Sequence, residues 1–268
     1  MTDALITSPQ NPRIKSLVKL ADRKGRQVAG LFAVEGNREI ERALESGYDA
    51  SEIYFCREIM SKGAEKILAG LRRRLTASAI FEITASAYEK IAVREGSEGL
   101  VVTFKPAARS LTDWTPGKLP FILMTEDIEK PGNLGAMLRT ADGAGVDGVL
   151  VLSRSADIYS PQVIRSSLGA VFSNRVMTCS NEDAFEFCRK WKISTVVASP
   201  EAKSSWSTVN GKGAVAVLTG SEANGVSDWW KSRATAMVAI PMRGKVDSLN
   251  VSVATAIMLY EVRRQRDA

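Results

Sequence analysis

Three stretches in the second half of the sequence combine glycines with amide, hydroxyl, carboxylate and guanidinium side chains. Each follows a short apolar run, at residues 121–124, 214–218 and 237–240. The side chains that could bind or act on a polar ligand are Asn133, Arg139, Glu222, Ser248 and Asn250. Such groups hold phosphates and hydroxyls by hydrogen bonds, and a glycine such as Gly220 lets the backbone approach a ligand closely. The pattern is typical of a site that positions a substrate or a cofactor.

The composition limits the chemistry that such a site can perform. The chain has no histidine, which excludes histidine-based triads, histidine general bases and histidine metal ligands. Cys56, Cys179 and Cys188 are scattered and form no CxxC pair, which argues against a disulfide framework and a zinc site. We therefore expect no metal. Any reaction must use Asp, Glu, Arg, Lys, Ser, Asn or Tyr, or a cofactor that has its own reactivity.

The three stretches fit the loops of an alternating α/β domain. We predict strands at 121–124, 148–152, 194–198, 214–218 and 237–240, and helices at about 134–143, 161–168, 182–191 and 249–264. This alternation implies a mostly parallel sheet with helices on both faces. Ligands of such sheets bind at the carboxyl ends of strands, which selects the loops after Met124, Leu218 and Ile240. The apolar residues spaced as one buried face of the last helix are Val253, Ala254, Ile257, Met258 and Val262.

A smaller α/β domain precedes this one. We predict strands at 31–34, 53–55, 79–83 and 100–103, separated by helices at about 14–20, 38–44, 64–71 and 87–91. Residues 105–118 concentrate Pro, Gly and polar residues without a sustained period, which is typical of a linker. The expected organisation is a domain over 1–104, a linker over 105–118 and a second domain over 119–268.

The charge is compatible with a polyanionic partner. The formal net charge is +6 and the sequence pI is about 9.3. The basic residues concentrated near the N-terminus are Arg13, Lys15, Lys19, Arg23, Lys24 and Arg26. A solvated helix face would explain them equally well. The N-terminal residues lack the features of a signal peptide and the apolar runs are too short to cross a bilayer, so we expect a cytoplasmic protein.

Taken singly, each polar stretch also has a purely structural explanation. Asn133, Ser248 or Asn250 can cap a helix, and Arg139 can lie on a helix surface. Neither GxGxxG nor GxxxxGK[ST] surrounds Gly220, so the loop is not a dinucleotide fingerprint or a P-loop.

Together, however, the three stretches resemble the motifs of a known family, the SpoU (TrmH-type) RNA 2′-O-ribose methyltransferases of the SPOUT superfamily. The matching residues are Asn133-Leu134-Gly135 with Arg139-Thr140, then Leu218-Thr219-Gly220-Ser221-Glu222 with Gly225, then Ile240-Pro241-Met242 with Ser248-Leu249-Asn250-Val251-Ser252. Residues 157–172 resemble the stretch between the first two motifs. The resemblance covers about residues 119–265. It extends to the N-terminal part, where residues 8–12, Lys15 and residues 32–36 are similar to the small RNA-binding domain that precedes many SpoU catalytic domains.

The resemblance implies an α/β knot, in which the C-terminal segment threads through a loop and S-adenosylmethionine binds in the knot. It implies a first domain that binds RNA and has a fold like that of a ribosomal protein, and a second domain that carries the methyltransferase activity. It also implies a homodimer. By the same resemblance, the residues around the cofactor are Leu218, Thr219, Gly220, Ile240, Met242 and Leu249.

The resemblance further implies that the catalytic residues are Arg139, Asn133, Glu222, Ser248 and Asn250. The family's proposals make Arg139 the base, but an arginine is effectively always protonated. We therefore expect Arg139 to clamp an RNA phosphate and orient the ribose, with the proton passing to phosphate or water, and we favour an ion pair between Arg139 and Glu222. The basic residues from Arg13 to Arg26 would bind phosphates without reading sequence.

Other functions stay open at this stage. Ribosomal RNA is the expected substrate and transfer RNA the alternative; a non-catalytic RNA-binding protein, a base methyltransferase and a dinucleotide oxidoreductase are less well supported. Label transfer from S-adenosylmethionine and a comparison of its binding with that of NAD would separate them.

Overall fold

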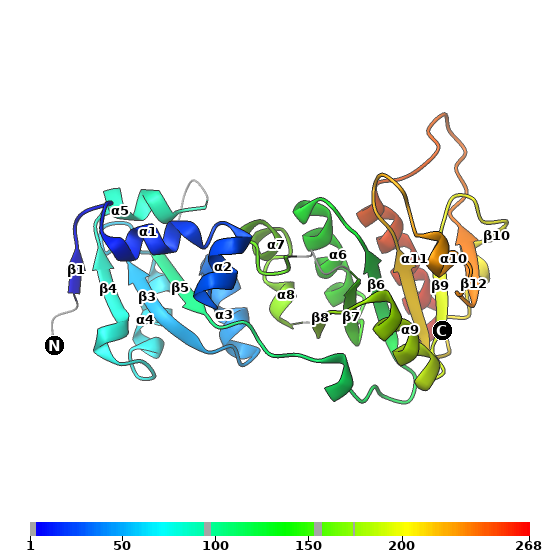
Figure 1. Cartoon of the computed structure of the whole chain (residues 1–268), viewed down its shortest axis with the longest axis horizontal. Coiled ribbons are helices and arrows are strands. Elements are labelled where there is room, and N and C mark those ends of the chain that lie inside the picture. The colour runs from blue at the N-terminus through cyan, green and yellow to red at the C-terminus, as the bar shows by residue number, and fades with distance from the viewer. Residues whose placement is uncertain (1–3, 94–97, 153–156, 174) are drawn as a thin grey trace. The chain divides into compact units, whose positions relative to one another are not determined.

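The computed structural model describes residues 4–93, 98–152, 157–173 and 175–268 (Figure 1). The chain divides into two compact units. Unit 1 comprises Met1–Ala108 together with Asp157–Gly169, and unit 2 comprises Arg109–Ala156 together with Ala170–Ala268. Residues 157–169 therefore belong to unit 1, although the sequence pattern predicted them in the second domain.

The contacts of this segment explain the difference. The Tyr159 ring stacks on Phe32 with 4.4 Å between ring centroids, and an Arg42 guanidinium N–H donates to the Leu168 carbonyl at 2.7 Å. Asp157 forms an ion pair with Arg26. Helix α7 (Pro161–Ser166) also packs on β2 (Phe32–Glu35). A local sequence pattern cannot reveal a segment that packs on residues more than a hundred positions away.

Unit 1 is built on a five-stranded sheet of order β1-β4-β3-β5-β2. Its strands are β1 (Ala4–Ile6), β2, β3 (Ala50–Phe55), β4 (Ile80–Ile83) and β5 (Leu100–Phe104). The β1-β4 and β4-β3 pairs are parallel, and β5 is antiparallel to both β3 and β2. Its helices are α1 (Pro12–Lys19), α2 (Arg23–Ala29), α3 (Asn37–Glu45), α4 (Lys62–Leu71), α5 (Ala85–Ile91) and α7, with a short 3₁₀ turn η1 (Ala77–Ala79).

Helix α1 shows how the sequence determines this unit. The Asn11 side chain caps the helix by accepting the Arg13 backbone N–H at 2.9 Å, and Pro12 occupies the first turn. Ile14 and Leu17 are buried against a core that includes Tyr54, and the intervening positions face solvent. Two elements were not predicted: β1 has only three residues, and α2 has no apolar period.

Unit 2 is built on a seven-stranded sheet of order β10-β12-β9-β11-β6-β7-β8. Its strands are β6 (Phe121–Glu126), β7 (Gly148–Leu152), β8 (Val176–Thr178), β9 (Ser194–Ala198), β10 (Ser204–Ser205), β11 (Val215–Thr219) and β12 (Ala236–Ala239). Every one of these neighbouring pairs is parallel, which confirms the predicted parallel sheet. Its helices are α6 (Pro131–Gly143), α8 (Ala170–Ser173), α9 (Asn181–Lys190), α10 (Asp228–Lys231) and α11 (Val251–Asp267), with 3₁₀ turns η2 (Leu111–Asp113) and η3 (Trp206–Thr208).

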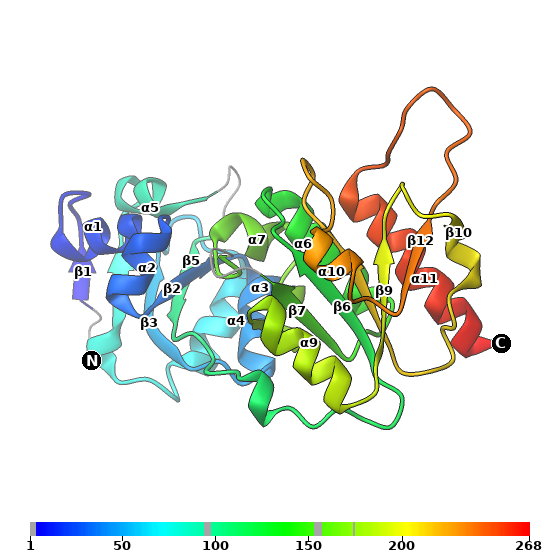
Figure 2. The same ribbon diagram turned by 45° about the vertical axis from the view of Figure 1, so that its right-hand side comes forward.

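Helices cover both faces of this sheet. Helices α9 and α10 lie on one face, in front of the sheet in Figure 2. On that face, Met124 and Leu218 pack with Phe187 of α9 and Trp230 of α10. Phe121 points to the opposite face, where the Arg266 guanidinium of α11 lies 5.0 Å from its ring centroid, and α11 also packs on α6. Successive residues of a strand face opposite sides, so a strand covered on both sides is largely apolar. All residues of β6, β7 and β11 are buried.

The buried face of α11 differs from the expected one. The helix buries Thr255, Met258, Leu259 and Val262, which have helical spacing, whereas Val253 is 47% exposed and Ala254 and Ile257 are partly exposed. The predicted face was therefore wrong by part of a turn, because a threonine occupies a buried position and a valine an exposed one. Among the described residues, no helix is long and apolar enough to span a membrane.

Candidate functional site

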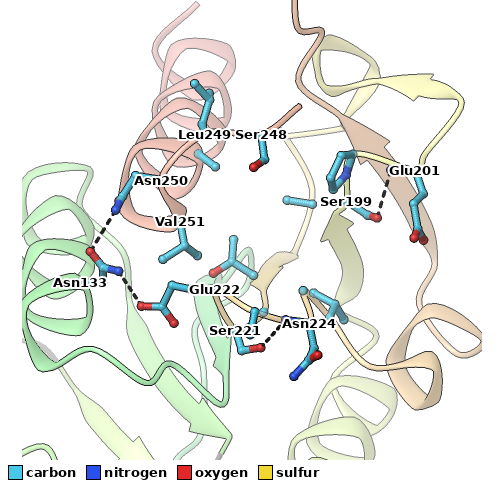
Figure 3. A pocket seen from close by; sticks show the side chains of 18 of the residues that line it. Asn133, Ser199, Glu201, Ser221, Glu222, Asn224, Ser248, Leu249, Asn250 and Val251 are labelled. Atoms are coloured by element: carbon cyan, nitrogen blue, oxygen red, sulfur yellow. Dashed lines mark hydrogen bonds between the residues drawn. The ribbon is translucent and has the colours of Figure 1, made fainter. Parts of the chain in front are cut away.

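A cavity of about 660 Å³ lies at the carboxyl ends of the central strands of unit 2 (Figure 3). Its walls come from the loops after β6, β9 and β11 and from the segment that joins β12 to α11. A smaller cavity of about 90 Å³ shares Ser199, Pro200, Ser248 and Leu249 with the first. The position agrees with the rule that parallel sheets bind ligands where their strands end.

The glycine loop, residues 220–226, forms one wall of the larger cavity. Ser221 and Gly225 exchange two backbone hydrogen bonds, at 3.0 and 2.9 Å, and Gly225 has a φ of 66°. A Cβ atom on Gly220 would lie 2.1 Å from the Gly225 carbonyl, so no other residue fits there without movement of the loop. The absence of a side chain at Gly220 therefore lets the loop close on its own backbone.

A chain of hydrogen bonds joins the three predicted motifs at one side of the cavity (Figure 3). The Asn250 amide donates to Asn133 Oδ1 at 3.2 Å, and Asn133 Nδ2 donates to Glu222 Oε1 at 2.5 Å. The other oxygen of the Glu222 carboxylate accepts the Glu129 backbone N–H at 3.1 Å. Asn250 also caps α11 by accepting the Ser252 backbone N–H at 2.9 Å. The capping role and the site role therefore belong to the same side chain.

The surroundings keep Glu222 ionised. Burial alone would raise the pKa of its carboxyl group, but the hydrogen bond from Asn133 and those from backbone N–H groups outweigh this effect. The net result is a pKa below the usual glutamate value. The carboxylate is therefore a hydrogen-bond acceptor that fixes the Asn133 amide. Its low pKa also makes it a weak base.

Four of the five predicted catalytic residues line the larger cavity, and Arg139 does not. Ser248 lines both cavities, and its hydroxyl donates to Asp247 at 3.3 Å. Arg139 is exposed on α6, about two turns along the helix from Asn133, and its guanidinium pairs with no other described residue. The expected Arg139–Glu222 ion pair is therefore wrong, because Asn133 and a backbone N–H occupy the carboxylate.

The predicted cofactor residues divide between the two cavities. Ile240, Met242 and Leu249 line the smaller one, and Thr219, Gly220 and Leu249 line the larger one. Leu218 lines neither: its side chain is fully buried in the core of the sheet, where it packs beside Trp230. Its side chain is therefore structural.

One wall of the site was not predicted from the sequence. Ser199, Pro200 and Glu201 follow β9 and line the larger cavity, as does Lys231, whose ammonium pairs with Glu201 at 2.8 Å. The strand at 194–198 was predicted, so the rule that selected the other three loops would also have selected this one. Its lack of glycine made it less conspicuous. Lys130 also lines the cavity, as does Asn133.

Most of the basic residues predicted to bind RNA are exposed in unit 1. Lys15, Lys19 and Lys24 are exposed, and Arg23 is half-buried. Arg13 is exposed, although its guanidinium pairs with Glu52 at 2.8 Å and lies over the Phe81 ring.

Arg26 must be removed from this set. Its side chain is only 7% exposed, and it donates to the carbonyls of Leu20 and Ala21 and pairs with Asp157. It belongs to the interior of unit 1 and is not available to a phosphate. Among the described residues, no group of three or more Cys, Asp or Glu side chains could hold a metal ion.

Two family models match the chain. The model of the SpoU rRNA methylase family matches residues 120–260, and that of the MRM3-like substrate binding domain matches residues 11–102.

Curated relatives match along nearly the whole chain. An uncharacterized tRNA/rRNA methyltransferase of Synechocystis is 31% identical over 98% of this chain and 94% of its own length. The 23S rRNA (guanosine-2′-O)-methyltransferase RlmP of Bacillus subtilis is 25% identical over 96% and 98%. A crystal structure of an AdoMet-bound rRNA methyltransferase from Sinorhizobium meliloti superposes with a TM-score of 0.88, at 27% identity over 97% of each chain. The chain belongs to the SpoU rRNA methylase family.

Proposed function

We propose that this protein transfers a methyl group from S-adenosylmethionine to a ribose 2′-hydroxyl of RNA, and that its substrate is ribosomal RNA. The observation that carries the proposal is the bonded chain Asn250–Asn133–Glu222 at the edge of the larger cavity, which adjoins a smaller cavity lined in part by Ile240, Met242 and Leu249. Relatives named as 23S rRNA 2′-O-methyltransferases support the reaction and the class of RNA.

The two cavities fit the cofactor's two chemically different ends. Ile240, Met242 and Leu249 give the smaller cavity apolar walls suited to a flat adenine ring. Gly220 lets the glycine loop close on its own backbone and form one wall, and the polar residues of the larger cavity suit a ribose and an amino acid. Bound S-adenosylmethionine supplies a methyl group already activated by its sulfonium, so the chain needs to provide geometry rather than acid catalysis.

Each polar side chain then has a task. Asn133, fixed by Glu222, presents its amide between the glycine loop and α11 and orients the target ribose together with Asn250. Arg139, exposed and without a partner among the described residues, is available to clamp an RNA phosphate through its two parallel N–H donors. A permanently protonated guanidinium cannot serve as the base, so the hydroxyl proton passes to phosphate or water. RNA is selected because DNA lacks the 2′-hydroxyl.

The exposed basic residues Arg13, Lys15, Lys19 and Lys24 of unit 1, together with the half-buried Arg23, would bind RNA phosphates. Such contacts increase affinity without reading sequence. Unit 1 is accordingly the substrate-binding part and unit 2 the catalytic part, which differs from the expected division into 1–104 and 119–268 chiefly at residues 157–169. A knotted C-terminal segment stays a prediction from the family.

A homodimer and a cytoplasmic location complete the proposal. The α11 surface carries Val253, 47% exposed, and Tyr260, 51% exposed, at the spacing of one helix face with the partly exposed Ile257 between them. A second copy of the chain would cover these side chains. In bacteria, the source of the relatives named above, ribosomal RNA is made and assembled in the cytoplasm, where such an enzyme would act.

Two measurements test the proposal. Calorimetric titration should detect S-adenosylmethionine binding and no comparable binding of NAD. Label from the methyl group should then pass to unmodified ribosomal RNA and not to transfer RNA. Labelling of transfer RNA alone would move the assignment to that substrate, and binding without labelling of either pool would support a non-catalytic RNA-binding protein.

A further inference from the structure

Glu126, the last residue of β6, is a buried carboxylate that lines neither cavity. Its side chain is 3% exposed and accepts three hydrogen bonds. Oε2 accepts the Ser227 backbone N–H at 2.7 Å, while Oε1 accepts the Ser227 hydroxyl at 2.7 Å and Asn181 Nδ2 at 3.0 Å. All three donors are uncharged. A buried carboxylate is costly unless its hydrogen bonds are satisfied, so this arrangement needs a reason.

The donors come from two separate elements. Ser227 is the residue before α10 and follows the glycine loop directly, whereas Asn181 is the first residue of α9. The buried Trp230 indole N–H donates to Asn181 Oδ1 at 2.9 Å, which directs the amide nitrogen of Asn181 toward Glu126. The carboxylate thus joins β6, the start of α9 and the end of the glycine loop in one network.

This network helps to hold the C-terminal end of the glycine loop, which lies outside the paired strands. At its start, Thr219 is held in β11, where it pairs with Thr125 of β6. At its end, Val226 is buried by apolar packing, which is non-directional. The Ser227 backbone is held on the side of α10 by its carbonyl, which accepts the N–H groups of Trp230 and Lys231, and on the side of β6 by its N–H, which donates to Glu126, as does its hydroxyl. Gly225 and Val226 line the larger cavity, so a displacement of Ser227 alters the cavity wall.

We propose that Glu126 is a positioning residue for cofactor binding, which holds the glycine loop through Ser227 in the shape that S-adenosylmethionine requires. The inference rests on the proposed function of the cavity. On this inference, a side chain that lies outside the cavity contributes to the affinity of the protein for the cofactor.

The network requires an acceptor at both oxygens of residue 126. In Glu126→Gln the amide nitrogen would replace one oxygen and would face either the backbone N–H of Ser227 or the Asn181 amide nitrogen, both of which are donors. The Ser227 hydroxyl can reverse its role, but these two N–H groups cannot. In this variant, an N–H donor of residue 126 therefore faces another N–H donor, although the side chain keeps the volume and shape of glutamate.

The Asn181→Asp substitution supplies the missing acceptor. In the double variant E126Q/N181D, the amide nitrogen introduced at position 126 would donate to the carboxylate introduced at position 181 and to the Ser227 hydroxyl. The amide oxygen at position 126 would accept the Ser227 N–H, and the new carboxylate would still accept from Trp230. Every polar group is again satisfied, with the direction of one hydrogen bond reversed. Restored cofactor binding in the double variant would therefore identify the network itself as the cause.

The test measures the Kd of S-adenosylmethionine by calorimetry on the full chain, with kcat and KM determined for the same proteins. We expect E126Q to raise the Kd about tenfold, Ser227→Ala to raise it about threefold, and E126Q/N181D to return it to within about threefold of wild type. KM for the cofactor should follow the Kd, whereas kcat at saturating cofactor should change little. Val149→Ala, a buried change on β7, serves as the control. It should lower Tm without changing the Kd.

The results separate the two claims. A wild-type chain that binds no S-adenosylmethionine refutes the proposed function. A wild-type chain that binds it, with E126Q and S227A equally tight, overturns the role of Glu126 alone. If E126Q does not fold, S227A decides, because it removes one hydrogen bond and leaves the carboxylate intact. Lower Tm in E126Q with an unchanged Kd would show a purely structural role.

Discussion

Asn133 Nδ2 donates to Glu222 Oε1 at 2.5 Å, which ties the first turn of α6 to the glycine loop after β11. The two residues are far apart in sequence, and each belongs to a different motif. The bond sets the orientation of the Asn133 amide and lowers the pKa of Glu222. It is the contact around which the polar side of the cavity is organised.

Removal of this bond should change both rate and pH dependence. Asn133→Ala leaves Glu222 half-buried without its strongest donor, so the pKa of the carboxyl should rise toward or above its usual value. In wild type the low pKa keeps Glu222 ionised at neutral and mildly acidic pH. We expect kcat to fall about tenfold in the variant and its acid limb to move to higher pH. A pH profile of kcat measures this, and an unshifted acid limb would contradict it.

Arg139 should act through the two parallel N–H donors of its guanidinium group and not only through its positive charge. Arg139→Lys keeps the positive charge and loses the two parallel donors, so we expect kcat to fall about 100-fold while the Kd of S-adenosylmethionine stays unchanged. Single-turnover kinetics with saturating cofactor and RNA would measure the effect. A near-wild-type rate would count against an orienting clamp.

Gly220 should tolerate no side chain. A Cβ at this position would meet the Gly225 carbonyl at 2.1 Å, so Gly220→Ala must displace the loop and should abolish detectable cofactor binding. Gly132→Ala, in the first turn of α6, is the matched control, because no atom lies within 4 Å of its added Cβ. Equal cofactor affinity in the two variants would refute a role for the loop shape.

The exposed apolar face of α11 should mediate self-association. Val253→Asp places a charge in the proposed interface and should convert a dimer to a monomer in sedimentation velocity experiments. Val28→Asp, at a valine that is 82% exposed in α2, is the control and should leave the oligomeric state unchanged. A wild-type chain that sediments as a monomer would reject the dimer.

Acid should destabilise the chain partly through Glu261. Its carboxylate accepts from Arg264 at 2.8 and 2.9 Å and from Gln265 at 2.7 Å, and these contacts lower its pKa to about 2. Because the folded pKa lies below the unfolded one, the stabilisation is complete above the unfolded value of about 4.3 and is lost as pH falls toward 2. Tm measured from about pH 6 to about pH 2 should therefore fall less steeply in Glu261→Gln than in wild type. Parallel curves would contradict the assignment.

The sequence predicted most of what local patterns can encode. The strands of unit 2 except the short β8 and β10, and the gathering of Asn133, Glu222, Ser248 and Asn250, follow from apolar periods and from the rule that loops at strand ends converge. The contacts of Arg26, Glu126 and Tyr159 could not be predicted, because each depends on a partner distant in sequence. Arg26 is the clearest case. It lies in a basic cluster of the sequence, yet its side chain is buried and pairs with Asp157, which is 131 positions away.

The most direct test of the central claim is the chemical identity of the methylated product. Ribosomal RNA labelled by the wild-type chain with methyl-labelled S-adenosylmethionine should be digested to nucleosides and separated by liquid chromatography with mass detection. We predict that the label lies in a 2′-O-methylnucleoside and that Arg139→Lys strongly reduces it. Label in a methylated base would contradict ribose methylation, and absence of label from ribosomal RNA would contradict the proposed substrate.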